Sequence, residues 1–268
     1  MDRPDWAPER VDIDRPSAAR GYDYLLGGSH NFAVDREAAH QAMAMMPDLV
    51  MQAQANRAFL YRAVGYLVEA GVRQFLDIGS GVPTVGNVHE VAQRVDPQAR
   101  VVYVDIDPVA VAHSQAMLAG NPLATVVQED LRSPAGILGH PEVRRLLDLE
   151  APVGLLMLAM LHAIPDSDQP HRIVGQLRDA LAPGSHLAIS HATPDGRPDV
   201  WERVVQLSGQ SSYPLTPRSR SDVERFFSGL ELVDPGLVWV PQWRPEHPDD
   251  VDGAPEHSSI YAGVGRLT

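Results

Sequence analysis

The sequence of 268 residues contains no cysteine, and all 22 of its positively charged side chains are arginine. Without cysteine, the chain cannot form disulfide bonds, cysteine-ligated zinc or iron–sulfur sites, or a thiol nucleophile. Without lysine, it cannot use a Schiff base or the lysine of a phosphate-binding P-loop. Covalent catalysis through either residue type is therefore excluded.

Positive charge and long apolar runs are also scarce. The excess of 35 acidic over 22 basic residues gives a net charge of −13, which provides no affinity for a phosphate backbone through counterion release. The longest apolar stretch, Pro152–Ile164, is shorter than the roughly 20 residues of a membrane span. The charged N-terminal sequence MDRPDWAPERVDIDRP lacks the apolar core of a signal peptide. We therefore expect a cytoplasmic protein with no nucleic-acid or membrane partner.

Histidine is frequent, but its spacing does not suggest a metal site. The 11 histidines include no H-x-x-x-H or H-E-x-x-H helix motif. We therefore expect no metal.

The hydrophobic pattern predicts an N-terminal arm and helical cap over residues 1–70, followed by an α/β domain over residues 71–268. The cap would contain a short helix within Ser17–Leu26 and longer helices over Val34–Met46 and Asp48–Ala70. Buried strands are expected at Arg73–Ile78, Arg100–Asp105, Ala124–Gln128, Val153–Leu158 and His186–Ser190. Helical segments separate these strands, as in a doubly wound parallel sheet with a Rossmann-like fold.

The C-terminal part departs from this alternation. After predicted helices at Val200–Ser208 and Ser219–Phe227, two strands at Leu230–Val240 and Ile260–Val264 follow without a helix between them. Such a hairpin typically adds antiparallel strands to one sheet edge. The complete prediction is a mostly parallel, seven-stranded sheet.

The first predicted strand runs into the glycine-rich sequence FLDIGSGVPT, which contains Asp77, Gly79 and Gly81. Glycines at such a turn let the backbone approach a ligand closely, next to a helix N-terminus. A dinucleotide fingerprint would have a third glycine at position 84, where this chain has Thr84. The carboxylate of Asp77 also suits a ligand with a positive ammonium group better than a pyrophosphate.

Two further acidic positions extend this pattern. Asp105 ends the second strand 24 residues beyond Gly81, at a position suited to binding the two hydroxyls of a ribose. After the third strand, the sequence Glu129-Asp130-Leu131 offers a carboxylate for an adenine amino group and an apolar side chain for the ring. An ammonium group, a ribose and an adenine together describe S-adenosylmethionine.

With these features the chain resembles class I S-adenosylmethionine-dependent methyltransferases. It is most similar to the actinobacterial S-adenosyl methyltransferase family, formerly known only as a domain of unknown function. The resemblance covers nearly the whole chain and rests on ARGYDYLLGGSHNFAVDREAA, FLDIGSGVPTVGNVHEVAQ, YVDIDPVAVAHS, MLAMLHAIPD and RSRSDVERFFSGLELVDPG. The chain departs from the general methyltransferase loop at Pro83, where a third glycine is often found.

The resemblance implies a role for each matching residue around the cofactor. The methionine part would contact Gly79, Ser80 and Gly81, with Asp77 near its ammonium group. Asp105 would bind the ribose and Ile106 would pack on the adenine, whose edge Asp130 and Leu131 would frame. Ala159 and Met160 would lie near the sulfonium.

The segment Tyr22–Asn31 (YDYLLGGSHN) is predicted to form a lid, because class I sites open at the carboxyl ends of their strands. Simple packing on the sheet is the alternative. The candidate general bases are Tyr22, Asp23 and His162, and the candidate substrate contacts are Tyr24, Met160 and Trp201. For His162, a hydrogen-bonded loop histidine is an equally good interpretation.

The predicted function is methyl transfer to a small neutral or aromatic metabolite of secondary metabolism. The acceptor atom would be oxygen, nitrogen or carbon, as in an indole-like ring, and it would attack the methyl group in line. One alternative is a catalytically silent S-adenosylmethionine-binding sensor or partner protein. An NAD-dependent oxidoreductase is disfavoured by Asp77 and by the missing third glycine. The acceptor and the choice between a monomer and a homodimer stay open.

Overall fold

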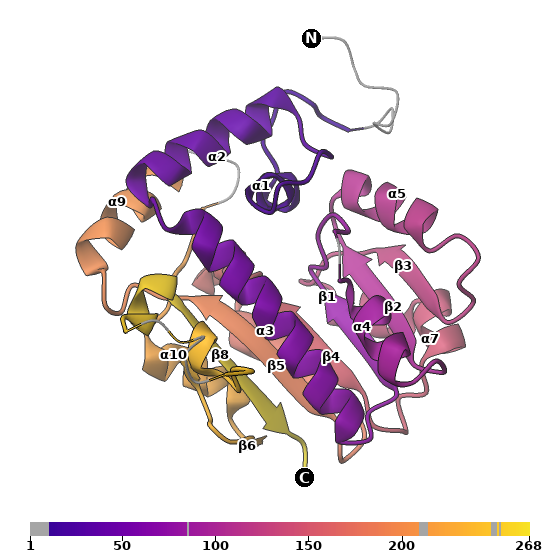
Figure 1. Ribbon diagram of the computed structural model, residues 1–268. Coiled ribbons are helices and arrows are strands. Elements are labelled where there is room, and N and C mark those ends of the chain that lie inside the picture. Colours follow the sequence, from indigo (N-terminus) through magenta and orange to yellow (C-terminus); the bar gives the residue numbers. More distant parts are fainter. Residues whose placement is uncertain (1–10, 85, 209–213, 248–250, 252) are drawn as a thin grey trace.

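The computed structural model describes residues 11–84, 86–208, 214–247, 251 and 253–268 (Figure 1). Its centre is an eight-stranded sheet in the order β3-β2-β1-β4-β5-β8-β6, in which β7 also pairs with β8. Helices cover both faces of this sheet (Figure 1). The predicted α/β architecture is confirmed.

The first five strands all pair in parallel. They are β1 (Gln74–Ile78), β2 (Arg100–Asp105), β3 (Ala124–Gln128), β4 (Gly154–Leu158) and β5 (His186–Ala192). Their sequences are nearly continuous apolar runs because helices bury both faces of the sheet. Parallel pairing places all five carboxyl ends at one edge of the sheet, so the loops that follow these strands meet there.

The antiparallel addition is also confirmed, with one correction. β8 (Ile260–Arg266) pairs antiparallel with β5 over its full length. The single strand expected at Leu230–Val240 is instead two short strands, β6 (Glu231–Leu232) and β7 (Val238–Trp239), each paired with β8. The turn sequence Asp-Pro-Gly at positions 234–236 separates them, because proline cannot donate a ladder hydrogen bond. This division produces the eighth strand.

One face of the sheet is covered by α3 (Leu49–Glu69), which runs across it (Figure 1). Phe59, Val64 and Leu67 of this helix are almost fully buried and share one apolar cluster with strand residues such as Phe75 and Leu156. The burial of each such side chain contributes about 1.5–3 kcal/mol. The division of the chain at residue 70 stays a prediction.

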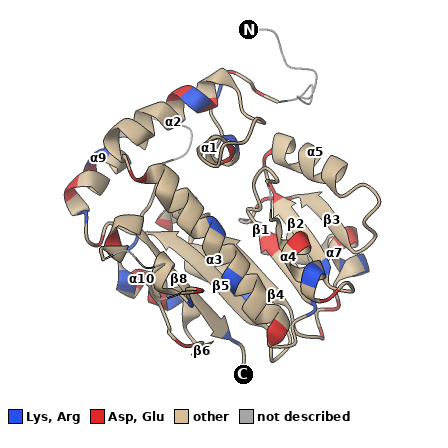
Figure 2. Cartoon of the chain, in the orientation of Figure 1, with Lys and Arg blue, Asp and Glu red and all other residues tan. Residues whose placement is uncertain are grey.

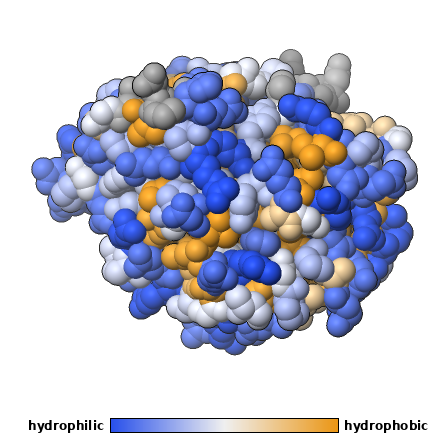
Figure 3. All heavy atoms as spheres, turned by 60° about the horizontal axis from the view of Figure 1, so that its bottom comes forward, coloured by the Kyte–Doolittle hydropathy of each residue, from blue (hydrophilic) through white to orange (hydrophobic). Residues whose placement is uncertain are grey.

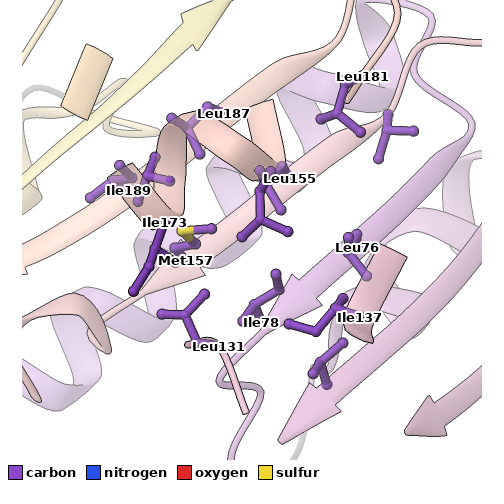
Figure 4. Packing of buried hydrophobic residues seen from close by; sticks show 14 of the residues in the cluster. Leu76, Ile78, Leu131, Ile137, Leu155, Met157, Ile173, Leu181, Leu187 and Ile189 are labelled. Carbon is purple, nitrogen blue, oxygen red and sulfur yellow. The ribbon is translucent and has the colours of Figure 1, made fainter. Parts of the chain in front are cut away.

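The opposite face carries the larger apolar cluster, which is shown in Figure 4. Strand residues such as Leu76 and Leu155 pack there against Ile137 and Ile173 of the covering helices. These helices are α6 (Pro134–Gly139), α7 (Pro141–Leu146), α8 (Pro170–Arg178) and α10 (Arg220–Glu224). The sequence analysis had no prediction for α6 and α7.

Two of the remaining helices follow the first two strands. α4 (Val88–Val95) has Asn87 as its N-cap residue, and α5 (Pro108–Met117) has Asp107, whose carboxylate accepts a hydrogen bond from the Val109 amide. The side chain of Asp107 therefore caps the N-terminus of α5.

The N-terminal helices α1 (Ala18–Leu25) and α2 (Ala33–Met45) lie beyond the carboxyl ends of the parallel strands (Figure 1). We call residues 18–45, which comprise both helices and the loop between them, the cap. α2 also contacts α9 (Pro198–Ser208), so the cap continues toward the end of β5.

The surface shown in Figure 3 is mostly hydrophilic, and its hydrophobic areas are separate from one another. No helix within the described part of the chain is both long and apolar enough to cross a membrane.

Candidate functional site

The glycine-rich turn after β1 has the backbone conformation that its sequence predicts. Gly79 and Gly81 have φ angles of 73° and 69°, in the left-handed region that favours glycine. A Cβ atom on Gly79 would lie only 2.9 Å from the Cβ of Met160. The amides of Gly79 and Ser80 donate hydrogen bonds to the Val104 carbonyl at 2.8 and 3.2 Å. The turn therefore lies at the ends of β1 and β2, with Met160 directly against it.

A basic and an acidic side chain line the same cavity beside this turn. Arg57 of α3 and Asp77 of β1 line one cavity of about 10 Å³, which has room for a single water molecule. Arg57 also donates hydrogen bonds to Thr84 Oγ1 at 2.6 Å and to Asn87 Oδ1 at 3.2 Å. The Ser80 hydroxyl, which lines the same cavity, is buried and has no hydrogen-bond partner in the described structure. A carboxylate, a guanidinium and an available hydroxyl suit the amino-acid end of a ligand.

The ribbons of β1 and β2 carry acidic positions, which Figure 2 colours red. The side chain of Asp77 is 6% exposed, and burial raises its pKa to about 7, with a smaller contribution from Asp105. The positive charge of Arg57 opposes this increase. A cation bound beside Asp77 would favour the ionised carboxylate.

Asp105 ties the glycine-rich turn to the loop after β2. Its Oδ2 accepts a hydrogen bond from the Gly81 amide at 2.7 Å, and its Oδ1 accepts one from the Asp107 amide at 2.8 Å. Burial raises the pKa of Asp105 to about 6, although these backbone hydrogen bonds oppose the increase. Each carboxylate oxygen has a second lone pair, so the group can still accept hydrogen bonds from two hydroxyls.

Ile106 follows this carboxylate with 54% of its surface exposed. An apolar surface beside a hydroxyl-binding carboxylate suits the plane of a nucleobase. Sequence position and exposure thus support the predicted order of ribose and adenine contacts.

Two residues predicted to frame the adenine, Asp130 and Leu131, have other contacts in the structure. The Asp130 carboxylate forms a salt bridge with Arg132 at 2.6 Å. Burial opposes ionisation of Asp130, but hydrogen bonds from Arg132 outweigh it and lower the pKa. Leu131 is 4% exposed and packs in the core together with Ile78 and Ile137 (Figure 4). The side chain of Leu131 therefore lies beneath this edge rather than on it.

The residue after β4 has an uncommon backbone conformation. Ala159 has a φ angle of 52°, and its amide donates hydrogen bonds to both the carbonyl and the hydroxyl of Ser190, at 3.0 and 2.9 Å. The Ser190 hydroxyl donates to Asn56 Oδ1, and Asn56 Nδ2 donates to the Tyr22 hydroxyl at 2.9 Å. The network ends where Tyr22 donates to the Ala53 carbonyl at 3.0 Å. It connects the cap to the position predicted to lie nearest the sulfonium.

This network bears on the predicted role of Tyr22 as a general base. The hydroxyl both donates and accepts within the protein, and burial raises its pKa, which opposes formation of the phenolate. These contacts suit a positioning role better than proton abstraction. The catalytic assignment stays a prediction.

Asp23 and Tyr24 contact other parts of the cap. Asp23 is 2% exposed, and its Oδ2 accepts hydrogen bonds at 2.9 Å from the His30 amide and from Asn31 Nδ2. Gly28 packs so closely on this carboxylate that a Cβ atom there would overlap it. The Tyr24 hydroxyl instead bonds His40 of α2 at 2.7 Å. The three candidates Tyr22, Asp23 and Tyr24 thus contact three different segments, and the structure does not bring them together.

A buried arginine joins the cap to the loop after β2. Arg20 is 4% exposed and donates to Asp35 Oδ2 at 2.9 Å and to Asp107 Oδ2 at 3.3 Å. The Ser17 hydroxyl also donates to Asp107, and the Ser17 amide donates to Asp35 at 2.8 Å. Because the Asp107 amide in turn bonds Asp105, the cap and the predicted ribose site share one polar network.

His162 and Trp201 lie near the carboxyl end of β5. His162 belongs to the 3-10 helix Leu161–Ala163, and its Nδ1 is 3.5 Å from the Ala192 amide. Burial and the nearby charge of Arg218 lower the pKa of His162 to about 4, so the ring is neutral at pH 7. Trp201 of α9 packs in one cluster with Ala192 and Met46, and its buried Nε1 has no partner among the described residues. His162 and Trp201 therefore both lie near Ala192, although they belong to different elements.

Four residues that the structure adds to the site were not predicted from the sequence: Arg20, Asn56, Arg57 and Arg218. Asn56 and Arg57 are adjacent polar residues in the helical stretch ANRAFLYRAV, and this polar pair was a usable signal. Arg20 and Arg218 gave no local signal, because their partners are distant in sequence. The described residues contain no group of three or more metal-ligating side chains.

Comparisons with known proteins show similarity over nearly the whole chain. A family model described as S-adenosyl methyltransferase matches residues 4–268. A candidate methyltransferase of Thermobifida fusca is 42% identical, with a TM-score of 0.93 and 99% of this chain and 100% of that chain covered. A DUF574 family protein of Streptomyces avermitilis is 41% identical, with a TM-score of 0.93 and 97% and 100% covered.

More distant structures support the fold alone. An O-methyltransferase family protein of Burkholderia thailandensis is 12% identical, with a TM-score of 0.54 and coverage of 97% of this chain and 65% of that chain. No curated protein matches the chain.

Replacing Arg20 with methionine should destabilise the protein strongly. The variant would leave the buried carboxylates of Asp35 and Asp107 without their cation, so the free energy of unfolding should fall by about 3–5 kcal/mol. Urea denaturation measures this change. Arg145→Gln is the matched control, because the Arg145–Glu142 pair is exposed and its loss should cost at most about 0.5 kcal/mol. A loss below about 1 kcal/mol for Arg20→Met would contradict the role of Arg20 in joining the cap to the loop after β2.

The raised pKa of Asp77 predicts how stability depends on pH. Between about pH 4 and 7 the folded protein retains a proton that the unfolded chain has released, so the free energy of unfolding should fall as pH rises and level off above 7. Asp77→Asn cannot ionise and should show a smaller fall. The measurement is urea denaturation of both proteins at pH 5.0 and 7.5. Equal falls in the two proteins would show that Asp77 does not titrate in this range.

Proposed function

The chain belongs to the S-adenosyl methyltransferase family, and from this membership we propose that it methylates a small, neutral, mainly apolar or aromatic metabolite. Family membership implies S-adenosylmethionine as the methyl donor. When bound, this cofactor supplies a methyl group already activated by a sulfonium, so the protein mainly positions the reactants and excludes water. The observation that supports the proposal most strongly is that Asp77 and Arg57 line one cavity beside the glycine-rich turn, one strand from Asp105 and Ile106.

The residues around the turn fit the methionine end of the cofactor. Asp77 would bind its ammonium group and Arg57 its carboxylate, while the buried hydroxyl of Ser80 is available for a further hydrogen bond. A Cβ atom on Gly81 would meet nothing within 4 Å, so the backbone there would allow close approach. A dinucleotide would instead place its pyrophosphate beside the Asp77 carboxylate, which disfavours NAD.

The residues of the next two loops fit the nucleoside. Asp105 would accept hydrogen bonds from the ribose hydroxyls, and the exposed side chain of Ile106 would pack on the adenine. Asp130 would accept from the adenine amino group alongside its salt bridge with Arg132. Leu131 would contribute through its main chain, because its side chain is buried in the core.

We place the methyl acceptor beyond the ends of β4 and β5, next to Ala159, Met160 and His162. The cluster on this side is apolar and consists of Met45, Met46, Leu49, Ala192, Val200, Trp201, Val204 and Leu215. The neighbouring charges of Arg197 and Asp48 pair with each other. An apolar wall with one available indole N–H suits a neutral acceptor that carries a hydrogen-bond-accepting atom.

The neutral ring of His162 is available to accept the proton that an oxygen or nitrogen acceptor loses as its lone pair attacks the methyl carbon. The cap, fastened by Arg20 and by the network of Tyr22, would keep water away from this reaction.

The cofactor assignment is tested by calorimetric titration with S-adenosylhomocysteine and with NAD. Asp105→Ala removes two ribose hydrogen bonds worth about 2 kcal/mol, so the Kd for S-adenosylhomocysteine should rise about thirtyfold. Asp179→Asn, at an exposed residue distant in sequence, should leave the Kd unchanged. Because Asp105 also supports the turn, Asp105→Asn is measured in parallel and should retain more affinity than alanine. Preference for NAD, or equal affinity in all variants, would contradict the assignment.

The acceptor class is tested with S-adenosylmethionine labelled in its methyl group and pairs of neutral phenols or hydroxyindoles and their carboxylated analogues. The neutral member of each pair should be methylated at least about tenfold faster, because the described cluster around Trp201 contains no cationic side chain to pair a buried carboxylate. Trp201→Phe removes the indole N–H and should raise KM about tenfold while the Kd of S-adenosylhomocysteine stays constant. Preference for the charged analogues would contradict the neutral class, and cofactor binding without transfer to any of them would favour a silent binding protein.

A further inference from the structure

A second buried arginine organises the loop that follows β4. Arg218, in the segment before α10, is 4% exposed. Its guanidinium donates hydrogen bonds to the carbonyls of Leu161 at 3.0 Å and Ile164 at 2.9 Å. It also donates twice to Asp166 Oδ1, at 2.7 and 3.2 Å, and once to His191 Nε2 at 2.9 Å. All five N–H donors of the side chain are therefore used. A lysine has three donors and could not reproduce this fork.

The contact with His191 determines where the proton of that ring lies. An arginine can only donate, so Nε2 of His191 must accept. The other nitrogen, Nδ1, is 2.7 Å from the Ala192 carbonyl and must therefore carry the proton and donate it. His191 is fully buried, and its burial, the neighbouring His162 and the charge of Arg218 all lower its pKa. The ring is fixed as one neutral tautomer.

His191 in turn packs on His162. The two ring centroids are 5.7 Å apart, and the rings are nearly perpendicular at 81°. The His162 carbonyl also accepts a hydrogen bond at 2.7 Å from the amide of Thr216, two residues before Arg218. Phe226 stacks on His191 and lies below the Arg218 guanidinium, with centroid distances of 5.9 and 5.7 Å. The backbone and the ring of His162 thus both depend on the segment that contains Arg218.

The charge of Arg218 is only weakly compensated. Asp166, its one acidic partner, is 76% exposed on its side chain, so solvent screens that ion pair, and the other partners are neutral. A neutral side chain could hold the loop without the desolvation cost of a buried cation. His171, which stacks on Phe226 at a centroid distance of 4.0 Å, and Arg225 are not acidic, and the nearby Asp222 pairs with Arg225 at 2.9 Å. The guanidinium also lies beside two neutral histidines, His162 and His191, and its charge lowers the pKa of both.

We infer that Arg218 is a positioning residue for methyl transfer: it fixes the loop of residues 161–166 and, through His191, the orientation of His162 toward the acceptor. The inference rests on the proposed function only for the acceptor-side role of His162. The arrangement of Arg218, His191 and His162 is a property of the protein alone.

The test is histidine NMR of the full-length protein labelled with nitrogen-15 and carbon-13 in its histidines, with and without S-adenosylhomocysteine. In the wild type, His191 should be the Nδ1–H tautomer and His162 should titrate near pH 4. In Arg218→Gln the cation is lost, so the pKa of His162 should rise by about one unit and His191 should populate both tautomers. A merely structural arginine would change neither signal once the fold is retained.

Two further variants keep the inference testable. Arg218→Lys retains the charge but not the fork, so His162 should keep its low pKa while His191 loses its single tautomer. Asp166→Asn retains the guanidinium and should leave both histidines as in the wild type. Unchanged His191 and His162 signals in folded Arg218→Lys and Arg218→Gln would overturn the inference. Failure to bind S-adenosylhomocysteine would contradict the proposed function instead, since the histidine signals of the free protein do not depend on it.

Discussion

The buried contact of Arg20 with Asp35 and Asp107 is the constraint on which the rest of the site depends. A cation and two carboxylates without contact with water are favourable only when all of them are in place, because each unpaired charge carries a large desolvation cost. Asp35 belongs to the cap and Asp107 to the loop after β2, so this contact makes the two segments one unit. The same Asp107 bonds Asp105 through its amide, and Asp105 holds Gly81 of the glycine-rich turn.

The cap is fastened a second time at the other end of the site. Tyr22 reaches Asn56 of α3, and from there the hydrogen bonds continue through Ser190 to the strained backbone of Ala159. A non-glycine residue in the left-handed region persists only when its surroundings hold it, as the two bonds from the Ala159 amide do here. The cap thus contacts the strand ends on both the proposed cofactor side and the proposed acceptor side. Such a position suits a reaction in which water must be excluded.

The two sides of the site differ in chemistry, which is consistent with the two reactants proposed for them. The cofactor side presents Asp77, Arg57 and Asp105, which suit the charged and hydroxylated parts of one molecule. The acceptor side presents an apolar cluster around Trp201 and the neutral ring of His162. Arg218 contributes its charge to this side from behind His191 rather than from within the apolar cluster.

The sheet could be predicted because strands buried on both faces leave a direct trace in the sequence. β3 begins and ends at the predicted residues, whereas the segment 230–240 was predicted as one strand because its apolar composition masks the turn at its centre. α6 and α7 were missed because helices of six residues are too short to show a periodicity.

In the site, too, residues with a local sequence signal could be predicted and residues with distant partners could not. The turn at Gly79 and the exposed side chain of Ile106 follow from local sequence. Arg20 and Arg218 do not, because their partners Asp107 and Leu161 lie 87 and 57 residues away, and only the fold brings them together.

A crystal structure of the complex with S-adenosylhomocysteine tests the central claim most directly. We expect the ammonium group at Asp77, the carboxylate at Arg57, the ribose hydroxyls at Asp105 and the adenine on Ile106, with the contact between Arg20 and Asp107 intact above them. An adenosine bound elsewhere, or a cap displaced so that Arg20 leaves Asp107, would contradict a cofactor site held together by the buried charges of the cap.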